Sequence, residues 1–196
     1  MSAKANRHGN GNGNGNGVDS NLQTEVRSGT EDDLGELTRI YNHYVLETPI
    51  TFDIEPLTVD QRRPWLLTHP DSGPHRLLVA EEGGKLLGYA TSSAFRPKQA
   101  YATSVETSVY LAPAHPGRGV GSLLYAALFE VLEREEVHVA LAGITVPNEA
   151  SQRLHERFGF RPAGRFEQVG RKFGQFWDVA WFQKPLSRAA EATVTR

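Results

Sequence analysis

The stretch from Pro116 to Ser122 reads PGRGVGS and has the composition of a phosphate-binding turn. Its three alternating glycines let the backbone approach a ligand closely, because no Cβ stands in the way. A long helix is expected to begin at Gly119, and the unpaired N–H groups of a first helical turn bind phosphate. Arg118 adds a positive charge at the same place. These features indicate a site for a phosphate-bearing ligand; the alternative is a turn that only joins a strand to a helix.

Two common phosphate motifs do not fit this turn. A P-loop requires Lys followed by Ser or Thr after its last glycine, and Gly121 is followed by Ser122 and Leu123. A dinucleotide fingerprint requires a third glycine, and the two positions where it could stand are Ser122 and Leu124. A Rossmann unit would also place this turn after its first strand, yet several elements precede it here. We therefore exclude both motifs.

Glu106 is the candidate general base. It lies just before the glycine turn, in a run of mostly uncharged residues from 100 to 114. A carboxylate in such a run is partly removed from water, which raises its pKa towards the value of a useful base. The alternative is a strand carboxylate that points into solvent, which is the usual location of glutamate.

Asn148 and His155 stand seven residues apart, which is two helical turns, and so share one face of a helix. Histidine donates protons near neutral pH and is a candidate acid at this position. The alternatives are that Asn148 caps the helix, which is compatible with a ligand contact, and that His155 is a half-buried helix residue. Both interpretations of His155 remain open.

Alternating strand and helix patterns must position these residues. The apolar periodicity predicts helices over residues 30–47, 59–68, 119–136 and 148–158, and strands over residues 24–27, 77–81, 86–94, 104–111, 137–146, 161–169 and 177–183. Residues 137–146 are almost wholly apolar, which predicts a strand buried on both faces. Hairpins and crossovers both occur, so we expect an α/β (α+β) fold with a mixed, largely antiparallel central sheet flanked by helices.

The composition narrows the function classes. The chain has 196 residues, of which 39% are hydrophobic and 22% charged, as in a globular protein of one domain. Its formal charge of -2 provides no basic surface for nucleic acid. The lack of cysteine excludes disulfides, thiolate metal sites and a cysteine nucleophile. We expect no metal site, and any thioester chemistry must use a thiol that the ligand brings.

The ends of the chain have a different composition from its centre. Residues 9–17 alternate glycine and asparagine, so we expect a flexible tail over 1–21, a folded domain over 22–186 and a second tail over 187–196. No apolar run approaches the ~20 residues that span a bilayer, and no apolar stretch follows Lys4 and Arg7 as it would in a signal peptide. We expect a cytoplasmic protein without membrane contact.

The chain resembles the GNAT superfamily of N-acetyltransferases. The pyrophosphate loop of that superfamily reads Gln/Arg-x-x-Gly-x-Gly/Ala between a strand and a helix. Gly119 and Gly121 match it, whereas Pro116 stands where the family has Gln or Arg. The resemblance covers residues 26–186 and is greatest to the branch of phosphinothricin and methionine sulfoximine N-acetyltransferases. The segments that carry it are residues 40–42, 96–97, 105–110, 147–148, 154–155 and 169–174.

This resemblance implies an acyl-CoA N-acyltransferase (GNAT) fold with acetyl-CoA as co-substrate. It makes Glu106 the general base, acting directly or through water, and gives His155 the place where many members carry a tyrosine that protonates the thiolate. It implies that backbone groups of Val109, Tyr110 and Leu111 pair with the pantetheine arm, which Asn148 also contacts. The pyrophosphate would lie on Gly117, Arg118, Gly119, Val120, Gly121 and Ser122.

The resemblance also implies where the substrate binds. It places Arg96, Pro97 and Lys98 in a loop that faces the substrate, with Arg96 as a fork for an acidic group. Phe52 would lie in the pocket, and residues 106–108 (Glu106, Thr107 and Ser108) would line it. Three residues near the C-terminus would close the pocket from this chain or from the partner in a homodimer: Lys172, Phe173 and Trp177.

The implied reaction is acetyl transfer to the amino group of a small amino acid or analogue of the phosphinothricin, methionine sulfoximine or methionine sulfone type. Two alternatives remain open. One is a GNAT acetyltransferase for another amine or for protein N-termini, which needs an open peptide groove. The other is a non-catalytic regulator that binds acyl-CoA, which would bind acetyl-CoA without transfer to any amine.

Overall fold

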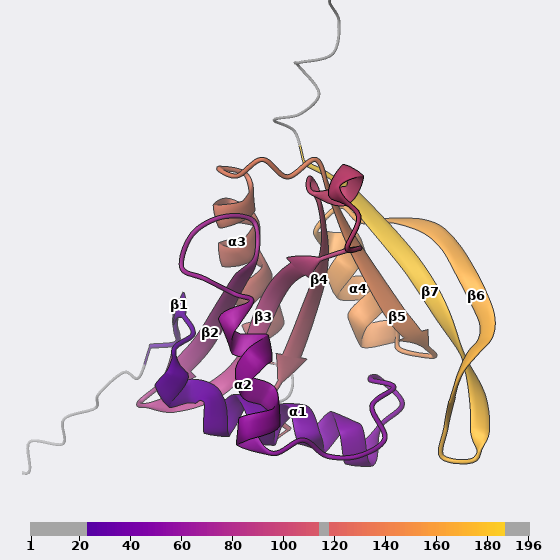
Figure 1. Cartoon of the computed structure of the whole chain (residues 1–196), viewed down its shortest axis with the longest axis horizontal. Helices are drawn as coiled ribbons and strands as arrows, with labels where there is room; N and C mark the ends of the chain where they lie inside the picture. Colours follow the sequence, from indigo (N-terminus) through magenta and orange to yellow (C-terminus); the bar gives the residue numbers. More distant parts are fainter. Residues whose placement is uncertain (1–22, 114–117, 187–196) are drawn as a thin grey trace, which may run out of the picture.

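The computed structural model describes residues 23–113 and 118–186. The predictions for the two tails, and those for Pro116 and Gly117, concern residues outside these ranges. Seven strands form one sheet in the order β1-β2-β3-β4-β5-β7-β6 (Figure 1). The strands are β1 Glu25–Ser28, β2 Arg76–Glu82, β3 Lys85–Ala94, β4 Ser104–Leu111, β5 Val139–Val146, β6 Arg161–Lys172 and β7 Gln175–Pro185. Only β4 and β5 pair in parallel, which confirms the prediction of a mixed, largely antiparallel sheet.

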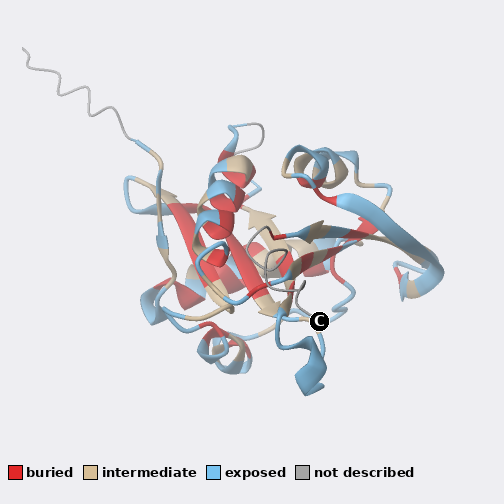
Figure 2. Cartoon of the chain, turned by 90° about the horizontal axis from the view of Figure 1, so that it is seen from above, coloured by how far each residue is buried: buried red, intermediate tan, exposed pale blue. Residues whose placement is uncertain are grey.

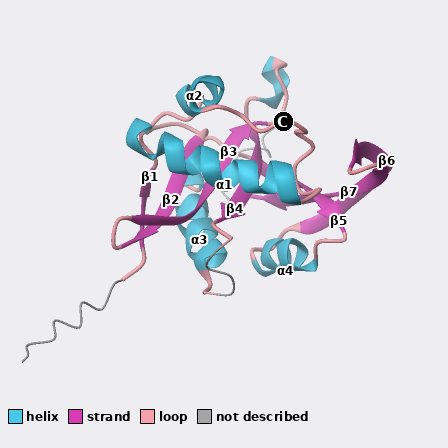
Figure 3. Cartoon of the chain, turned by 90° about the horizontal axis from the view of Figure 1, so that it is seen from below, coloured by secondary structure: helices cyan, strands magenta, loops and turns pink. Residues whose placement is uncertain are grey.

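Helices cover both faces of the sheet (Figure 3). They are α1 Leu34–Glu47, α2 Val59–Leu67, α3 Val120–Leu132 and α4 Glu149–Arg157, with short 3-10 helices η1 Glu31–Asp33 and η2 Gln99–Tyr101. On one face, α1 and α2 bury apolar side chains with β2 and β3. On the other face, α3 packs a larger apolar cluster against the centre of the sheet. Burial is accordingly concentrated in the middle strands and on the sides of the helices that face them (Figure 2).

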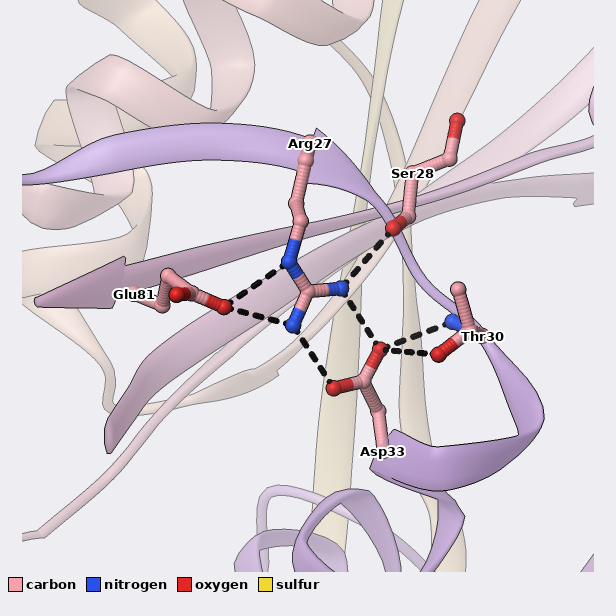
Figure 4. A network of polar contacts seen from close by, with 5 residues as sticks. All are labelled: Arg27, Ser28, Thr30, Asp33 and Glu81. Atoms are coloured by element: carbon pink, nitrogen blue, oxygen red, sulfur yellow. Dashed lines mark hydrogen bonds and ion pairs between the residues drawn. The ribbon is translucent and has the colours of Figure 1, made fainter. Parts of the chain in front are cut away.

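The predicted start of the first helix is confirmed, and it is tied to the edge of the sheet. Thr30 and Asp33 form a capping box, in which the backbone N–H of Thr30 donates to the Asp33 carboxylate at 2.7 Å. Arg27 of β1 donates to both oxygens of Asp33, at 2.7 and 2.9 Å, and to Glu81 of β2 at 2.8 Å (Figure 4). The guanidinium of Arg27 holds the pKa of Asp33 below its usual range. This network joins β1, β2 and η1.

Strands β4 and β5 stay together for only three residue pairs, Ser104–Val139, Val105–Ala140 and Glu106–Leu141. Beyond Glu106 the two strands diverge (Figure 1). Strand β4 continues along β3 as far as Leu111, whereas β5 continues along β7 as far as Val146. The sheet therefore opens at the residue that the sequence indicates as the base.

Strands β3 and β4 approach each other closely at Gly88. A Cβ added to Gly88 would lie 2.6 Å from the carbonyl oxygen of Tyr110, a distance that real side chains do not adopt. In contrast, a Cβ added to Gly164 of β6 would meet nothing within 4 Å. Gly88 is thus required by the local spacing of the strands, and Gly164 is not.

Three expectations about these elements need correction. Helix α3 ends at Leu132 instead of residue 136, because residues 133–136 are all charged and continue only as turns. Strand β5 is fully buried on the face of Ala140, Ala142 and Ile144 but only unevenly on the other, where Gly143 is exposed and Thr145 is buried. The last two strands are longer than predicted and form a hairpin, β6–β7, that projects from the body of the protein (Figure 1).

Candidate active site

Glu106 is half-buried on β4, at the last residue pair that joins β4 to β5. Side chains alternate along a strand, so Glu106, Ser108 and Tyr110 share one face of the sheet. This is the face covered by α1 and α2, because Tyr110 packs against their apolar cluster. Burial raises the pKa of Glu106 above its usual value, and the nearby positive charge of Arg96 opposes this rise without cancelling it. Glu106 thus has the environment of a general base.

Beyond Glu106, the edge of β4 that faces the opening between β4 and β5 is not paired with another described strand. The N–H of Ala112 donates to Leu87 of β3 at 2.8 Å. Backbone groups alternate between the two edges of a strand, so the N–H groups of Val109 and Leu111 point towards the gap. Among the described residues no strand pairs with this edge beyond Glu106. The Tyr44 hydroxyl reaches it from α1, donating to the Leu111 carbonyl at 2.8 Å and lying 3.2 Å from the Leu111 N–H.

The glycine turn leads directly into α3. Gly119 is the N-cap residue of α3 and has a φ of 76°, a left-handed conformation that favours glycine. A Cβ at this position would meet nothing within 4 Å, so the backbone lies open. The next two N–H groups, of Val120 and Gly121, have no acceptor inside the helix. Val120 and Gly121 are both buried, so Gly119 is the exposed residue at the start of α3.

Side chains around the turn are held by neighbouring elements. Arg118 forms a two-pronged ion pair with Glu82 at the end of β2, at 2.9 and 2.6 Å. The Ser122 hydroxyl accepts a hydrogen bond from Arg157 of α4 at 3.2 Å. Arg118 therefore lies beside the turn, as predicted, but a phosphate there would compete with the Glu82 carboxylate for it.

Asn148 caps α4, as the sequence predicts: its side-chain oxygen accepts from the Ser151 N–H at 3.1 Å. His155 is only 3% exposed. Its Nδ1 donates to the Ser151 carbonyl at 2.7 Å, and its Nε2 lies 2.9 Å from the Tyr125 hydroxyl. Burial lowers the pKa of His155, so the ring is neutral near pH 7. Because both ring nitrogens are engaged inside the core, this placement favours the structural interpretation of His155.

The residues that the sequence analysis assigned to substrate binding differ in their exposure and in the face of the sheet on which they lie. Arg96 is exposed, with its guanidinium 4.7 Å from the ring of Phe95, and Pro97 and Lys98 follow it in the exposed loop before η2. Ser108 lies on the same face as Glu106. Thr107 points to the opposite face, where it is buried and its hydroxyl donates to the Leu141 carbonyl at 3.3 Å. The side chain of Thr107 therefore cannot contact a substrate that binds beside Glu106.

The loop after α1 is attached to the β6–β7 hairpin. Phe52 packs so closely on Gly170 that a Cβ there would lie 2.2 Å from its ring. Lys172 is buried and donates to the Thr51 carbonyl at 2.7 Å, which fixes it as a structural link. Trp177 donates to the Lys172 carbonyl at 3.0 Å. Phe173 is exposed at the tip of the hairpin.

A cavity of about 270 Å³ opens on the face that carries Glu106 and Ser108. Ser93 and Ser108, from the two paired strands, line it together with Arg62 of α2 and Asp53. Its full lining is Tyr41, Asp53, Leu57, Gln61, Arg62, Trp65, Tyr89, Thr91, Ser93, Ser108 and Tyr110. Ser93 is the cross-strand neighbour of Glu106, so the cavity ends beside the candidate base.

Sequence reasoning missed most of this lining. Arg62 stands in a short polar helix beside Arg63, which is the usual pattern of two solvent-facing arginines. A weak signal exists in the spacing of Arg62 and Trp65, since residues three apart meet on one helix face.

Across residues 23–113 and 118–186, no group of three or more histidine or acidic side chains could hold a metal ion. Over the same ranges, no helix is long and apolar enough to cross a membrane.

Known proteins are similar to this chain in sequence and in fold. Residues 26–181 match the family described as acetyltransferase (GNAT) domain. A phosphinothricin N-acetyltransferase of Streptomyces coelicolor is 63% identical over 166 residues, which cover 84% of this chain and 97% of that protein. An L-methionine sulfoximine/L-methionine sulfone acetyltransferase of Salmonella typhimurium is 36% identical over 165 residues, covering 84% and 96%. A solved GNAT phosphinothricin acetyltransferase from Sinorhizobium meliloti, in complex with AcCoA, has a TM-score of 0.80 and 31% identity, covering 88% and 92%.

The family match spans the region that contains the open sheet, the turn before α3 and Glu106. The implied fold is confirmed by the solved structure, which is similar over most of both chains. The chain therefore belongs to the GNAT acetyltransferase family and is an N-acetyltransferase.

Proposed function

We propose that the protein transfers the acetyl group of acetyl-CoA directly to the amino group of a small amino acid or analogue, of the phosphinothricin, methionine sulfoximine or methionine sulfone type. Relatives that cover most of this chain carry these substrates in their names. The observation that carries the proposal is the position of Glu106. This half-buried carboxylate of raised pKa lies where β4 leaves β5, between an unpaired strand edge and a 270 Å³ cavity.

The residues of the gap suit acetyl-CoA. An extended pantetheine arm needs backbone partners, and the gap-facing N–H of Val109 supplies one. The N–H of Leu111 donates to the Tyr44 hydroxyl and would exchange that partner for the pantetheine arm. A diphosphate needs amides at a helix start, and the open backbone of Gly119, the N-cap of α3, gives it access to that end of the helix. When bound there, acetyl-CoA supplies an acetyl group that is activated as a thioester.

The amine must lose a proton before it can attack the acetyl carbon. Glu106 accepts that proton, directly or through one water, and its raised pKa makes it a stronger base than an exposed glutamate. A carbon–nitrogen bond then forms, the carbon–sulfur bond breaks, and the sulfur leaves as the thiolate of coenzyme A. The nitrogen loses its second proton in this step, and the thiolate takes up a proton to leave as the thiol. His155 takes no direct part in this proposal, because both of its ring nitrogens are bonded inside the protein. It positions Tyr125 and the end of α4.

Substitution of Glu106 by glutamine tests the base. We expect turnover to fall by roughly 10²- to 10⁴-fold, because a general base contributes about that much. Affinity for acetyl-CoA should stay within about a factor of three, since the side chain lies on the cavity side. Thiol release with phosphinothricin, methionine sulfoximine and methionine sulfone measures turnover, and calorimetry measures affinity.

Glu130→Gln is the matched control, because Glu130 is an exposed glutamate of α3 that pairs only with Arg134 among the described residues. This control should retain full turnover. Unchanged turnover in Glu106→Gln would remove Glu106 from the mechanism. Thiol release with a peptide N-terminus but with none of the amino acids would favour the protein-acetylating alternative, and acetyl-CoA binding without any transfer would favour the regulator.

We also propose a homodimer and a cytoplasmic location. Four apolar residues are exposed on the β6–β7 hairpin, namely Phe166, Val169, Phe173 and Phe176. Exposed apolar side chains that gather on one hairpin suit a contact with another protein chain. Localisation of a tagged chain by cell fractionation tests the second proposal.

A further inference from the structure

Arg62 is a buried cation on the wall of the 270 Å³ cavity. Only 4% of this residue is exposed. Its guanidinium lies between two aromatic rings, 4.1 Å from the centre of Tyr41 and 4.0 Å from that of Trp65. Nη2 donates to the Tyr89 hydroxyl at 2.8 Å. These ring contacts and the hydrogen bond to Tyr89 hold the guanidinium in place on the cavity wall.

No carboxylate in the described part of the chain forms an ion pair with Arg62. Its Nε is buried and has no hydrogen-bond partner among the described residues. Asp53 lines the same cavity, but its carboxylate accepts a hydrogen bond from the Tyr41 hydroxyl at 2.6 Å. A buried charge without a counter-ion is costly, and cation–π contacts offset only part of that cost. Such a cation beside a cavity is a binding site for an anionic or strongly polar group.

The other end of the cavity offers hydrogen-bond acceptors. His69 is buried, and its Nδ1 donates to the Trp65 carbonyl at 2.9 Å, which leaves Nε2 as an acceptor. The Ser93 hydroxyl, 2.9 Å from Nε2, therefore donates its proton to His69. The oxygen of Ser93 keeps its lone pairs for the cavity, and Glu106 is its cross-strand neighbour. Two acceptors side by side suit an amine.

The two ends of the cavity lie at different places along β3. Tyr89, which holds Arg62, and Ser93 are four residues apart on this strand and on the same face of it. An α-carboxylate is attached to the same carbon as the amine and stays beside it. An oxygen group at the end of the side chain lies further from the amine and therefore suits the end of the cavity that holds Arg62.

We propose that Arg62 binds the anionic or oxygen-rich end of the acceptor's side chain, while the amine of the same molecule lies at Ser93 and Glu106. The inference rests on the proposed function and makes it more specific: the acceptor is an amino acid whose side chain ends in a phosphinate, sulfone, sulfoximine or comparable oxygen group. Arg62 is then a specificity-determining residue that contacts the substrate.

The test compares two acceptors within each enzyme variant. Phosphinothricin carries the side-chain anion, and norleucine has an aliphatic side chain without oxygen. We expect the wild-type enzyme to have a higher kcat/KM for phosphinothricin. Arg62→Met should lower the ratio of the two kcat/KM values by roughly 10- to 100-fold, the effect of losing a hydrogen bond to a charged group. Partial unfolding of the variant would lower both apparent kcat/KM values by the same factor, so it does not change their ratio.

Arg63→Met is the matched control, because Arg63 is the adjacent arginine of α2 but is exposed and paired with Glu31. This variant should retain the wild-type ratio. Arg62→Lys, which keeps the charge but loses the planar fork, should give an intermediate ratio and replaces Arg62→Met if that variant does not fold. A wild-type enzyme without preference for phosphinothricin would overturn the inference. So would equal losses with both acceptors in the Arg62 variants, which would mean that Arg62 only supports the fold.

Binding measurements separate this inference from the proposed function. Calorimetric titration with phosphinothricin requires no turnover. Weaker binding to Arg62→Lys than to wild type, in a protein that acetylates no tested amine, would support the site and reject the proposed reaction. If the wild type acetylates an amino acid but wild type and Arg62→Lys bind phosphinothricin with equal affinity, the proposed reaction is supported and the Arg62 site is rejected.

Discussion

Glu106 and Arg96 approach each other from β4 and from the loop that follows β3. The burial of Glu106 favours its neutral form, and the guanidinium of Arg96 favours its charged form. Only the charged form can accept a proton from the amine. The rate should therefore fall as pH decreases through the pKa of Glu106, and this limb should lie above the usual range of a glutamate.

Arg96→Gln should move this limb to higher pH. Removal of the positive charge takes away the one influence that lowers the pKa of Glu106, so more alkaline conditions are needed to ionise it. The pH profile of kcat/KM for one acceptor measures the shift. Lys98→Gln is the control, because Lys98 is exposed in the same loop. A limb that stays in place, or that moves to lower pH, would show that the two side chains are not coupled in the working enzyme.

At the scale of residues, the sequence was informative where local composition determines the environment. The uncharged run around Glu106 predicted its partial burial. Strand alternation implies that the Thr107 side chain points to the opposite face of the sheet from Glu106 and Ser108. Which of these two faces lies against α1 and α2 could not be predicted from the sequence. The burial of Arg62 could not be predicted, because it depends on rings from α1, α2 and β3 that meet only in the folded chain.

At the scale of elements, the closeness of β3 and β4 has a measurable cost. Gly88→Ala should reduce the free energy of unfolding by roughly 1–3 kcal/mol, because the new Cβ meets the Tyr110 backbone and the strands must separate. Gly164→Ala should be neutral or stabilising by roughly 0.5–1 kcal/mol, because its Cβ enters open space and glycine is unfavourable in a strand. Urea denaturation of both variants checks the contrast, which equal effects would contradict.

The order and type of the elements were predictable from periodicity and turn residues. All seven strands and four helices occur where the apolar patterns indicate them. The divergence of β4 from β5 could not be predicted from the periodicity of either strand, because hydrogen bonds between distant strands leave no periodic trace in them. The uneven burial of the second face of β5, with Gly143 exposed and Thr145 buried, was missed because it depends on side chains from other elements.

At the scale of the whole molecule, the β6–β7 hairpin exposes apolar side chains to solvent. Phe173 and Phe176 are 56% and 60% exposed in the single chain. We expect light scattering to give twice the chain mass for the wild type and the chain mass for a Phe173→Glu/Phe176→Glu variant, since charges in an apolar contact oppose association. Leu67→Glu, at an exposed apolar residue of α2, should remain dimeric. A monomeric wild type would refute the homodimer.

The strand and helix patterns correctly indicated a mixed sheet flanked by helices, but not which parts of the chain form the cavity and the open edge. The cavity takes its whole lining from Tyr41 to Tyr110, whereas the turn before α3 lies outside that stretch. Under the proposed function, the residues that select the acceptor therefore come from one contiguous segment of the chain. Among the described strands, β4 alone is common to the cavity and to the open edge. We expect substitutions in the cavity lining upstream of β4 to alter which amine is acetylated, whereas Tyr44 and Glu82 in the same stretch contact the side proposed for coenzyme A.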